Sequence, residues 1–106
     1  MARTLISVPA AARRGEVIEI KALIAHLMET GYRPGSDGKL VPRDIITLFV
    51  CRYGEEEVFR AELSPATSAN PFLSFSTVAT ETGTLSFTWT GDRGFAQTET
   101  ARITVT

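Results

Sequence analysis

The segment from Leu63 to Trp89 restricts the fold more than any other part of the chain, because its second half alternates apolar and polar residues. There Leu85, Phe87 and Trp89 are separated by single serine or threonine residues. Side chains two residues apart point to the same face of a β-strand, so these three share one apolar face. Such a strand needs an apolar layer to cover it. The rest of the chain must supply that layer.

Six further segments have the composition of short strands, and glycine- or proline-containing turns separate most of them. They are Thr4–Val8, Glu16–Ala25, Asp44–Tyr53, Val58–Leu63, Phe72–Thr80 and Phe95–Thr106. Helix propensity is adequate over Leu23–Met28, but the alternation in Val17–Lys21 favours a strand. Seven short strands predict an all-β fold, an antiparallel β-sandwich of the immunoglobulin-like type.

Size and charge exclude several classes of protein. The 106 residues suit one domain, residues 1–106. A net charge of -1 gives no electrostatic reason to expect nucleic-acid binding, and no apolar run is long enough for membrane insertion. A single cysteine excludes an internal disulfide. The pair Arg13-Arg14 precedes alternating charges rather than an apolar core, so we interpret it as a basic turn and not as an export signal.

Four features could belong to a chemical site, but each has a simpler interpretation. For His26, the only histidine, the sequence identifies no catalytic partner or further metal ligand, which favours a structural hydrogen bond. Cys51 lies within a strand, where a buried and unreactive thiol is expected. The carboxylates of Glu55–Glu57 are too closely spaced for a calcium loop. The Gly35–Gly38 turn has neither the Lys-Ser/Thr ending nor the following helix of a phosphate loop. We therefore predict no catalytic, cofactor or metal site.

The strand Ile45–Tyr53 is apolar on both faces, more than a two-layer fold needs. One face carries Ile45, Phe49, Cys51 and Tyr53, and the other carries Ile46, Leu48 and Val50. A sandwich core covers only one face of each strand. The second must be covered by the long Glu29–Arg43 loop or by another chain. We predict Ile46, Leu48 and Val50 as the partner interface.

Several segments, taken together, resemble the SoxZ family, one subunit of the SoxYZ carrier complex of bacterial thiosulfate oxidation. The segments are Arg14–Ile20, His26 with Met28–Arg33, Pro42–Ile46, Glu56–Ala61, Ser68–Pro71, and Thr77–Leu85 with Phe87–Trp89. They occur in order over nearly the whole chain. Leu27 departs from the family pattern, which has proline after the histidine.

The resemblance implies an immunoglobulin-like sandwich that pairs with SoxY. SoxY carries sulfur intermediates covalently on a cysteine in a flexible C-terminal arm. No such arm is present here, since the chain ends within a strand at Arg102–Thr106 and Cys51 is far from that end. The resemblance therefore implies a non-carrying, non-enzymatic subunit that stabilises SoxY and docks transiently with other Sox enzymes. It also implies a periplasmic location, reached together with the signal-bearing SoxY.

Two alternatives remain at the level of the sequence. The chain could be a stand-alone ligand-binding sandwich that uses the Glu29–Arg43 loop, which has three glycines and two prolines. It could also carry a thiol-bound group on Cys51. Co-purification with a SoxY-like chain from cells that express both distinguishes the stand-alone module from the subunit role.

Overall fold

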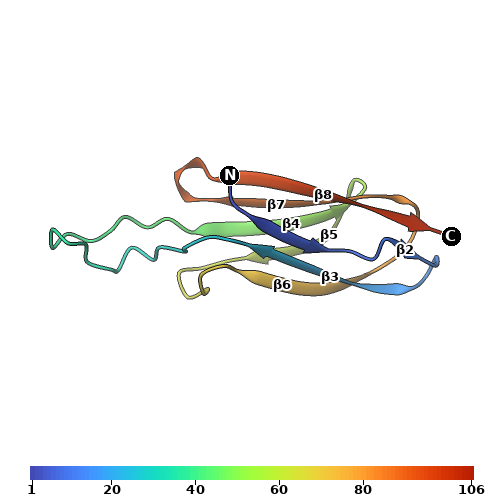
Figure 1. Ribbon diagram of the computed structural model, residues 1–106, viewed down its shortest axis with the longest axis horizontal. Coiled ribbons are helices and arrows are strands. Elements are labelled where there is room, and N and C mark those ends of the chain that lie inside the picture. Colours follow the sequence, from blue (N-terminus) through green and yellow to red (C-terminus); the bar gives the residue numbers. More distant parts are fainter.

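The computed structural model describes residues 1–106 and consists of two β-sheets. Its elements are β1 (Thr4–Ser7), β2 (Ala11–Ala12), β3 (Val17–Ile24), β4 (Ile46–Tyr53), β5 (Glu56–Glu62), β6 (Phe72–Val78), β7 (Gly83–Gly91), the short 3₁₀ helix η1 (Asp92–Gly94) and β8 (Ala96–Val105). The smaller sheet has the order β1-β3-β6 and the larger has the order β2-β8-β7-β4-β5. Figure 1 shows the strands of both sheets running along the long axis of the molecule. The predicted all-β sandwich is confirmed.

The core lies between the sheets and contains the apolar face that the alternating segment predicts. Leu85, Phe87 and Trp89 of β7 are all buried, and β7 lies in the larger sheet between β8 and β4. From the smaller sheet, β3 contributes the buried side chains of Ile18, Ile20, Ala22 and Ile24. Phe49 of β4 lies 5.3 Å from Trp89 and 6.2 Å from Phe75 of β6, measured between ring centroids. The first contact lies within the larger sheet, and the contact with Phe75 joins the two layers.

Strand β2 is absent from the sequence prediction, which had only a basic connection at this point. Ala11 and Ala12 pair in parallel with Thr104 and Val105 at the end of β8. Two residues are too few to show a period of two, and their partners lie at the far end of the chain. The structure therefore has eight strands where the sequence predicts seven.

Strand β4 contains an irregularity that corrects the predicted position of Ile46. Its register against β7 shifts between Ile46 and Leu48, where Ile46 is opposite Gly91 and Leu48 is opposite Thr90. An extra residue in one strand reverses the faces beyond it. Ile46 is consequently 0% exposed, and it does not share the outward face of Leu48 and Val50.

The loop between β3 and β4 folds back on itself as a narrow two-armed ribbon, residues 29–44, which we call the projecting ribbon. Its arms pair at Glu29 with Asp44 and at Pro34 with Leu40. The N–H of Gly35 donates to the carbonyl of Lys39 at the tip (2.7 Å). In Figure 1 this ribbon extends beyond the sandwich at one end, and it contributes to a long molecule of 59 × 20 × 19 Å.

Candidate functional site

Three apolar side chains lie in one row on the outer face of the smaller sheet, and we call them the apolar row. The strand register places Leu5 of β1 opposite Leu23 of β3, and Leu23 opposite Phe72 of β6. Leu5 is 69% exposed, Phe72 is 57% exposed and Leu23 is half-buried. Contiguous exposed apolar groups mark interaction sites more often than scattered ones do.

The sequence analysis missed this row, although a signal for it exists. Ile6 and Ile24 face the core, so Leu5 and Leu23 lie next to them on the opposite face. Phe72 likewise precedes the inward-facing Leu73. At this row each strand has apolar residues on both faces, which is the pattern that we used only for Ile45–Tyr53. The next row on the outer face, Ser7, Lys21 and Ser74, is polar.

The predicted interface residues Leu48 and Val50 lie on the outer face of the larger sheet. They are half-buried, and their neighbours on β7 are Thr90 and Thr88. The hydroxyl groups of Thr88 and Thr98 lie 3.1 Å apart on the next pair of strands. This face is more polar than the apolar row, and its aliphatic side chains are less exposed.

His26 follows β3 and is held by hydrogen bonds to its neighbours. Its backbone N–H donates to Oδ1 of Asn70 (3.0 Å), and its carbonyl accepts from the N–H of Asn70 (2.7 Å). The ring Nδ1 accepts from the N–H of Met28 (2.9 Å), so a neutral imidazole carries its proton on Nε2. The ring also makes an edge contact with Phe95 at 5.3 Å. These bonds agree with the structural role predicted for His26.

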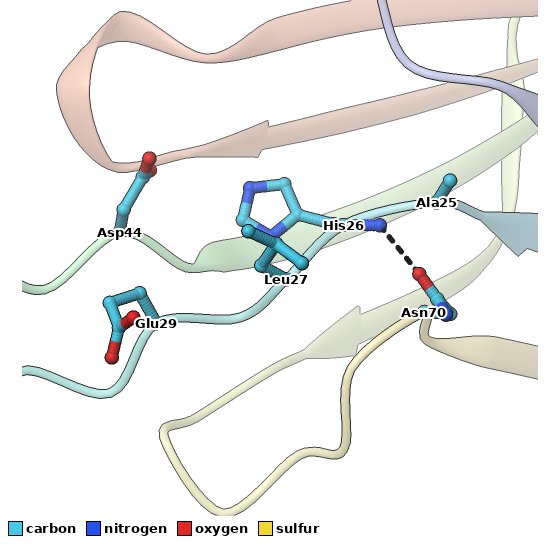
Figure 2. Close-up of a pocket in the computed structure, with 6 residues that line it drawn as sticks. All are labelled: Ala25, His26, Leu27, Glu29, Asp44 and Asn70. Carbon is cyan, nitrogen blue, oxygen red and sulfur yellow. Dashed lines mark hydrogen bonds between the residues drawn. The ribbon is translucent and has the colours of Figure 1, made fainter. Parts of the chain in front are cut away.

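A hollow of about 400 Å³ lies beside His26. Its walls are formed by Ala25, His26, Leu27, Glu29, Asp44 and Asn70. Figure 2 shows that they come from the end of β3, the base of the projecting ribbon and the loop before β6. The hollow thus combines a histidine, an amide and two carboxylates at one end of the sandwich.

Cys51 lies in the core of β4 and is 0% exposed. Burial in apolar surroundings disfavours the thiolate and raises the pKa of the Cys51 thiol to about 12. The thiolate is the nucleophilic form, so this side chain is unreactive near neutral pH. The structure therefore agrees with the unreactive thiol that the sequence predicts.

Cys51→Ser is expected to lower the free energy of unfolding and to leave the chain folded. A hydroxyl group buried at this apolar position costs about 1–3 kcal/mol by comparison with other mutants. Urea unfolding of both proteins measures the loss. A variant as stable as the wild type would contradict this expectation.

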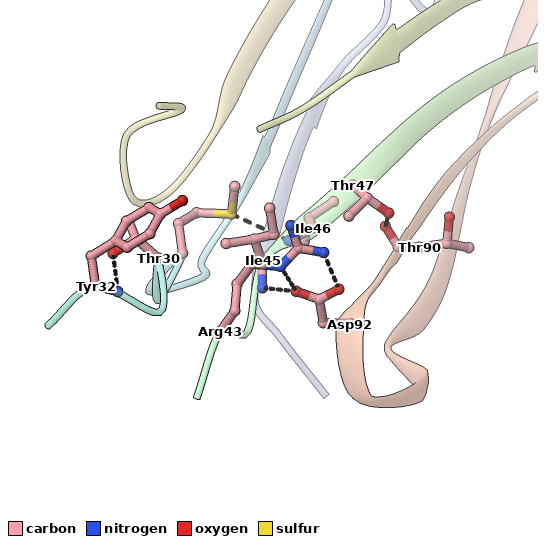
Figure 3. A network of polar contacts seen from close by, with 9 residues as sticks. Thr30, Tyr32, Arg43, Ile45, Ile46, Thr47, Thr90 and Asp92 are labelled. Carbon is pink, nitrogen blue, oxygen red and sulfur yellow. Dashed lines mark hydrogen bonds and ion pairs between the residues drawn. The ribbon is translucent and has the colours of Figure 1, made fainter. Parts of the chain in front are cut away.

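The base of the projecting ribbon is attached to the β7–β8 turn by a charged group of contacts (Figure 3). Arg43 donates from Nε to Oδ2 of Asp92 (2.8 Å) and from a terminal nitrogen to Oδ1 (2.9 Å). Oδ2 also accepts from the N–H of Ile45 (3.1 Å). The guanidinium of Arg43 is the largest cause of the lowered pKa of Asp92, and the Ile45 N–H is the next. A second pair, Arg33 with Glu29, connects residues within the ribbon.

The stabilisation by Asp92 is expected to disappear in acid. Because its pKa is lower in the folded chain, the contribution is complete above about pH 5 and is lost as the pH falls through the lowered pKa. The thermal midpoint of the wild type should exceed that of Asp92→Asn at neutral pH, and the difference should vanish in acid. Measuring both proteins removes the contribution of the other carboxylates. A difference that does not depend on pH would contradict the role of this charge.

No group of three or more His, Cys, Asp or Glu side chains is arranged to hold a metal ion. The structure also has no helix of the length and apolar character that a membrane span requires.

The fold resembles several solved structures. Superoxide reductase (neelaredoxin) from Ignicoccus hospitalis aligns with a TM-score of 0.77 and 14% identity, over 99% of this chain and 82% of that one. The sulfur carrier protein SoxY from Chlorobium limicola f thiosulfatophilum aligns with a TM-score of 0.67 and 15% identity, over 97% of this chain and 78% of that one. Identities this low support a shared fold only.

Comparison of the sequence, unlike comparison of the fold, identifies a protein family. No curated protein matches the sequence. The family model described as "Sulphur oxidation protein SoxZ" matches residues 6–102. This match covers nearly all of the 106 residues and every strand of both sheets except the ends of β1 and β8. The chain therefore belongs to the SoxZ family of sulfur oxidation proteins.

Proposed function

We propose that this chain is the non-carrying subunit of a sulfur carrier complex and binds a SoxY-like subunit. The observation that supports this most is the family match over residues 6–102. In the proposed complex the partner carries the sulfur intermediates covalently, and this chain keeps the partner folded and helps to present it to the other Sox enzymes. We further propose that both subunits act in the periplasm.

The side chains support a role without chemistry of its own. The buried Cys51, with its raised pKa, is a poor nucleophile for carrying sulfur. Nδ1 of His26, a nitrogen that could otherwise act as a base, already accepts a backbone hydrogen bond. We therefore expect no turnover of thiosulfate, sulfite or sulfide by the isolated chain.

For the interface with the SoxY-like subunit we propose the outer face of the smaller sheet, centred on the apolar row. Permanent interfaces are more apolar than the rest of a protein surface, and Leu5 and Phe72 are largely exposed in the isolated chain. The outer face of the larger sheet, with Leu48 and Val50, remains a second candidate. For transient docking of other Sox enzymes we propose the projecting ribbon, where Tyr32 and Leu40 are exposed.

Co-expression with a tagged SoxY-like chain tests the proposal. We expect the two chains to co-purify and to elute together in gel filtration. The isolated chain should not turn over any of the three sulfur compounds. Turnover by the chain alone, or a chain that stays single beside a folded SoxY-like partner, would contradict the proposal. The second of these results would favour a stand-alone binding module.

A further inference from the structure

The hollow beside His26 is one end of a longer groove. A second hollow of about 380 Å³ shares Ala25 and Asn70 with it. A third, of about 200 Å³, shares Leu5 and Leu23 with the second. Because neighbouring hollows share wall residues, we treat the three as one groove, which begins over the apolar row and ends at the base of the projecting ribbon.

The two ends of the groove differ in chemical character. At one end the third hollow is lined by the apolar row, Leu5, Leu23 and Phe72, together with Ile6, Ser7 and Lys21, and Lys21 is paired with Glu19. At the other end Glu29 and Asp44 present carboxylates. Figure 2 shows the imidazole of His26 in the same hollow as these side chains. An occupant of the whole groove must therefore have both an apolar part and a polar part.

The unpaired charges of the groove lie at different points along its length. Glu29 is paired with Arg33, but Asp44 takes part in none of the four ion pairs of the chain. Arg3 lines the middle hollow and is also absent from these pairs. The groove thus has an unpaired cation in the middle and an unpaired carboxylate at its ribbon end.

We propose that this groove binds an extended segment of the SoxY-like partner, with an aliphatic side chain on the apolar row and a lysine or arginine at Asp44. An acidic residue of the same segment lies between them, at Arg3. This inference rests on the proposed function and adds the chemical nature and direction of the bound segment. The order of charges in the bound segment follows from the positions of Arg3 and Asp44. A segment with the opposite order would place like charges together at both residues.

The test measures binding of the SoxY-like partner to the full chain and to Asp44→Asn. We expect the variant to bind about tenfold more weakly at low ionic strength, and the difference to shrink at about 0.5 M salt, where exposed charges are screened. Asp44→Glu should restore most of the affinity, because it keeps the carboxylate. The matched control is Asp37→Asn at the ribbon tip, which removes the same charge outside the groove and should bind like the wild type.

A second measurement distinguishes contact from a structural effect. In ¹⁵N-labelled chain, the partner should shift the amide signals of Ala25 and His26 and the side-chain amide of Asn70. Thermal midpoints of the Asp44 variants should stay at the wild-type value. A complex that forms with unchanged signals and with equal affinity for Asp44→Asn would overturn the groove and leave the proposed function standing. Failure of the wild-type chain to bind the partner at all would overturn both.

Discussion

Phe72→Asp is expected to abolish the complex with the SoxY-like subunit and to leave the isolated chain folded. Phe72 is 57% exposed on β6, so a carboxylate there stays in water when the chain is alone. In the complex the variant loses the burial of the aromatic side chain, worth about 1.5–3 kcal/mol. It also places a charge without a counter-ion in an apolar contact, which costs several kcal/mol more. Together these losses weaken binding by more than about a hundredfold.

Leu48→Asp is the matched variant on the other sheet. It makes the same kind of change at the residue that the sequence pattern selects for the interface, where the side chain is half-buried beside Thr90. If the apolar row is the interface, this variant should still form the complex. Circular dichroism reports folding of each variant, and gel filtration with the partner reports binding.

The two variants together decide between the faces. Loss of the complex with Leu48→Asp and its survival with Phe72→Asp would place the interface on the larger sheet. Unfolding of Phe72→Asp would be unexpected for an exposed position, and Leu5→Asp then provides a second test of the same row, because Leu5 is 69% exposed. A folded Leu5→Asp that still binds the partner would exclude the apolar row.

Gly91→Ala is expected to lower the free energy of unfolding by more than about 3 kcal/mol, a large part of the stability of a domain. A Cβ atom at Gly91 would lie 2.3 Å from the carbonyl oxygen of Ile45 and 2.8 Å from Cα of Ile46. Both are backbone atoms, so no side-chain rotation relieves the overlap. β7 would have to move away from β4 at the point where their register shifts.

Gly83→Ala is the matched control, because Gly83 begins the same strand. Its nearest neighbour for a Cβ atom, in the ring of Tyr53, is 3.7 Å away, which is an ordinary contact. We expect this variant to stay within about 1 kcal/mol of the wild type in urea unfolding. A similarly small change for Gly91→Ala would show that β4 and β7 are not held closely together there.

Much of the fold is predictable from local patterns, because a strand with one buried face must alternate. Leu85, Phe87 and Trp89 are buried where the alternation places them, and so are Ile18, Ile20, Ala22 and Ile24 of β3. The unreactive Cys51 follows for the same reason, since its position in a central strand already indicates burial. The family resemblance, too, depends only on the order of short segments along the chain, and the family match bears it out.

The remaining features depend on residues that meet only when the chain is folded. Ala11 and Ala12 become a strand because the end of β8 lies beside them. Ile46 lies in the core because β4 has one extra residue relative to β7 between Ile46 and Leu48. A simple alternation of apolar and polar residues in the sequence does not reveal such a shift.

The candidate binding surface has the same origin. The sequence by itself determined which strand faces are apolar, because alternation is a property of neighbouring residues. Only the tertiary structure decided that Leu5, Leu23 and Phe72 form one exposed row, because three separate strands must first be paired in register. It likewise placed Asn70 and Asp44 beside His26, since the backbone of Asn70 is hydrogen-bonded to His26 and that of Asp44 to Glu29.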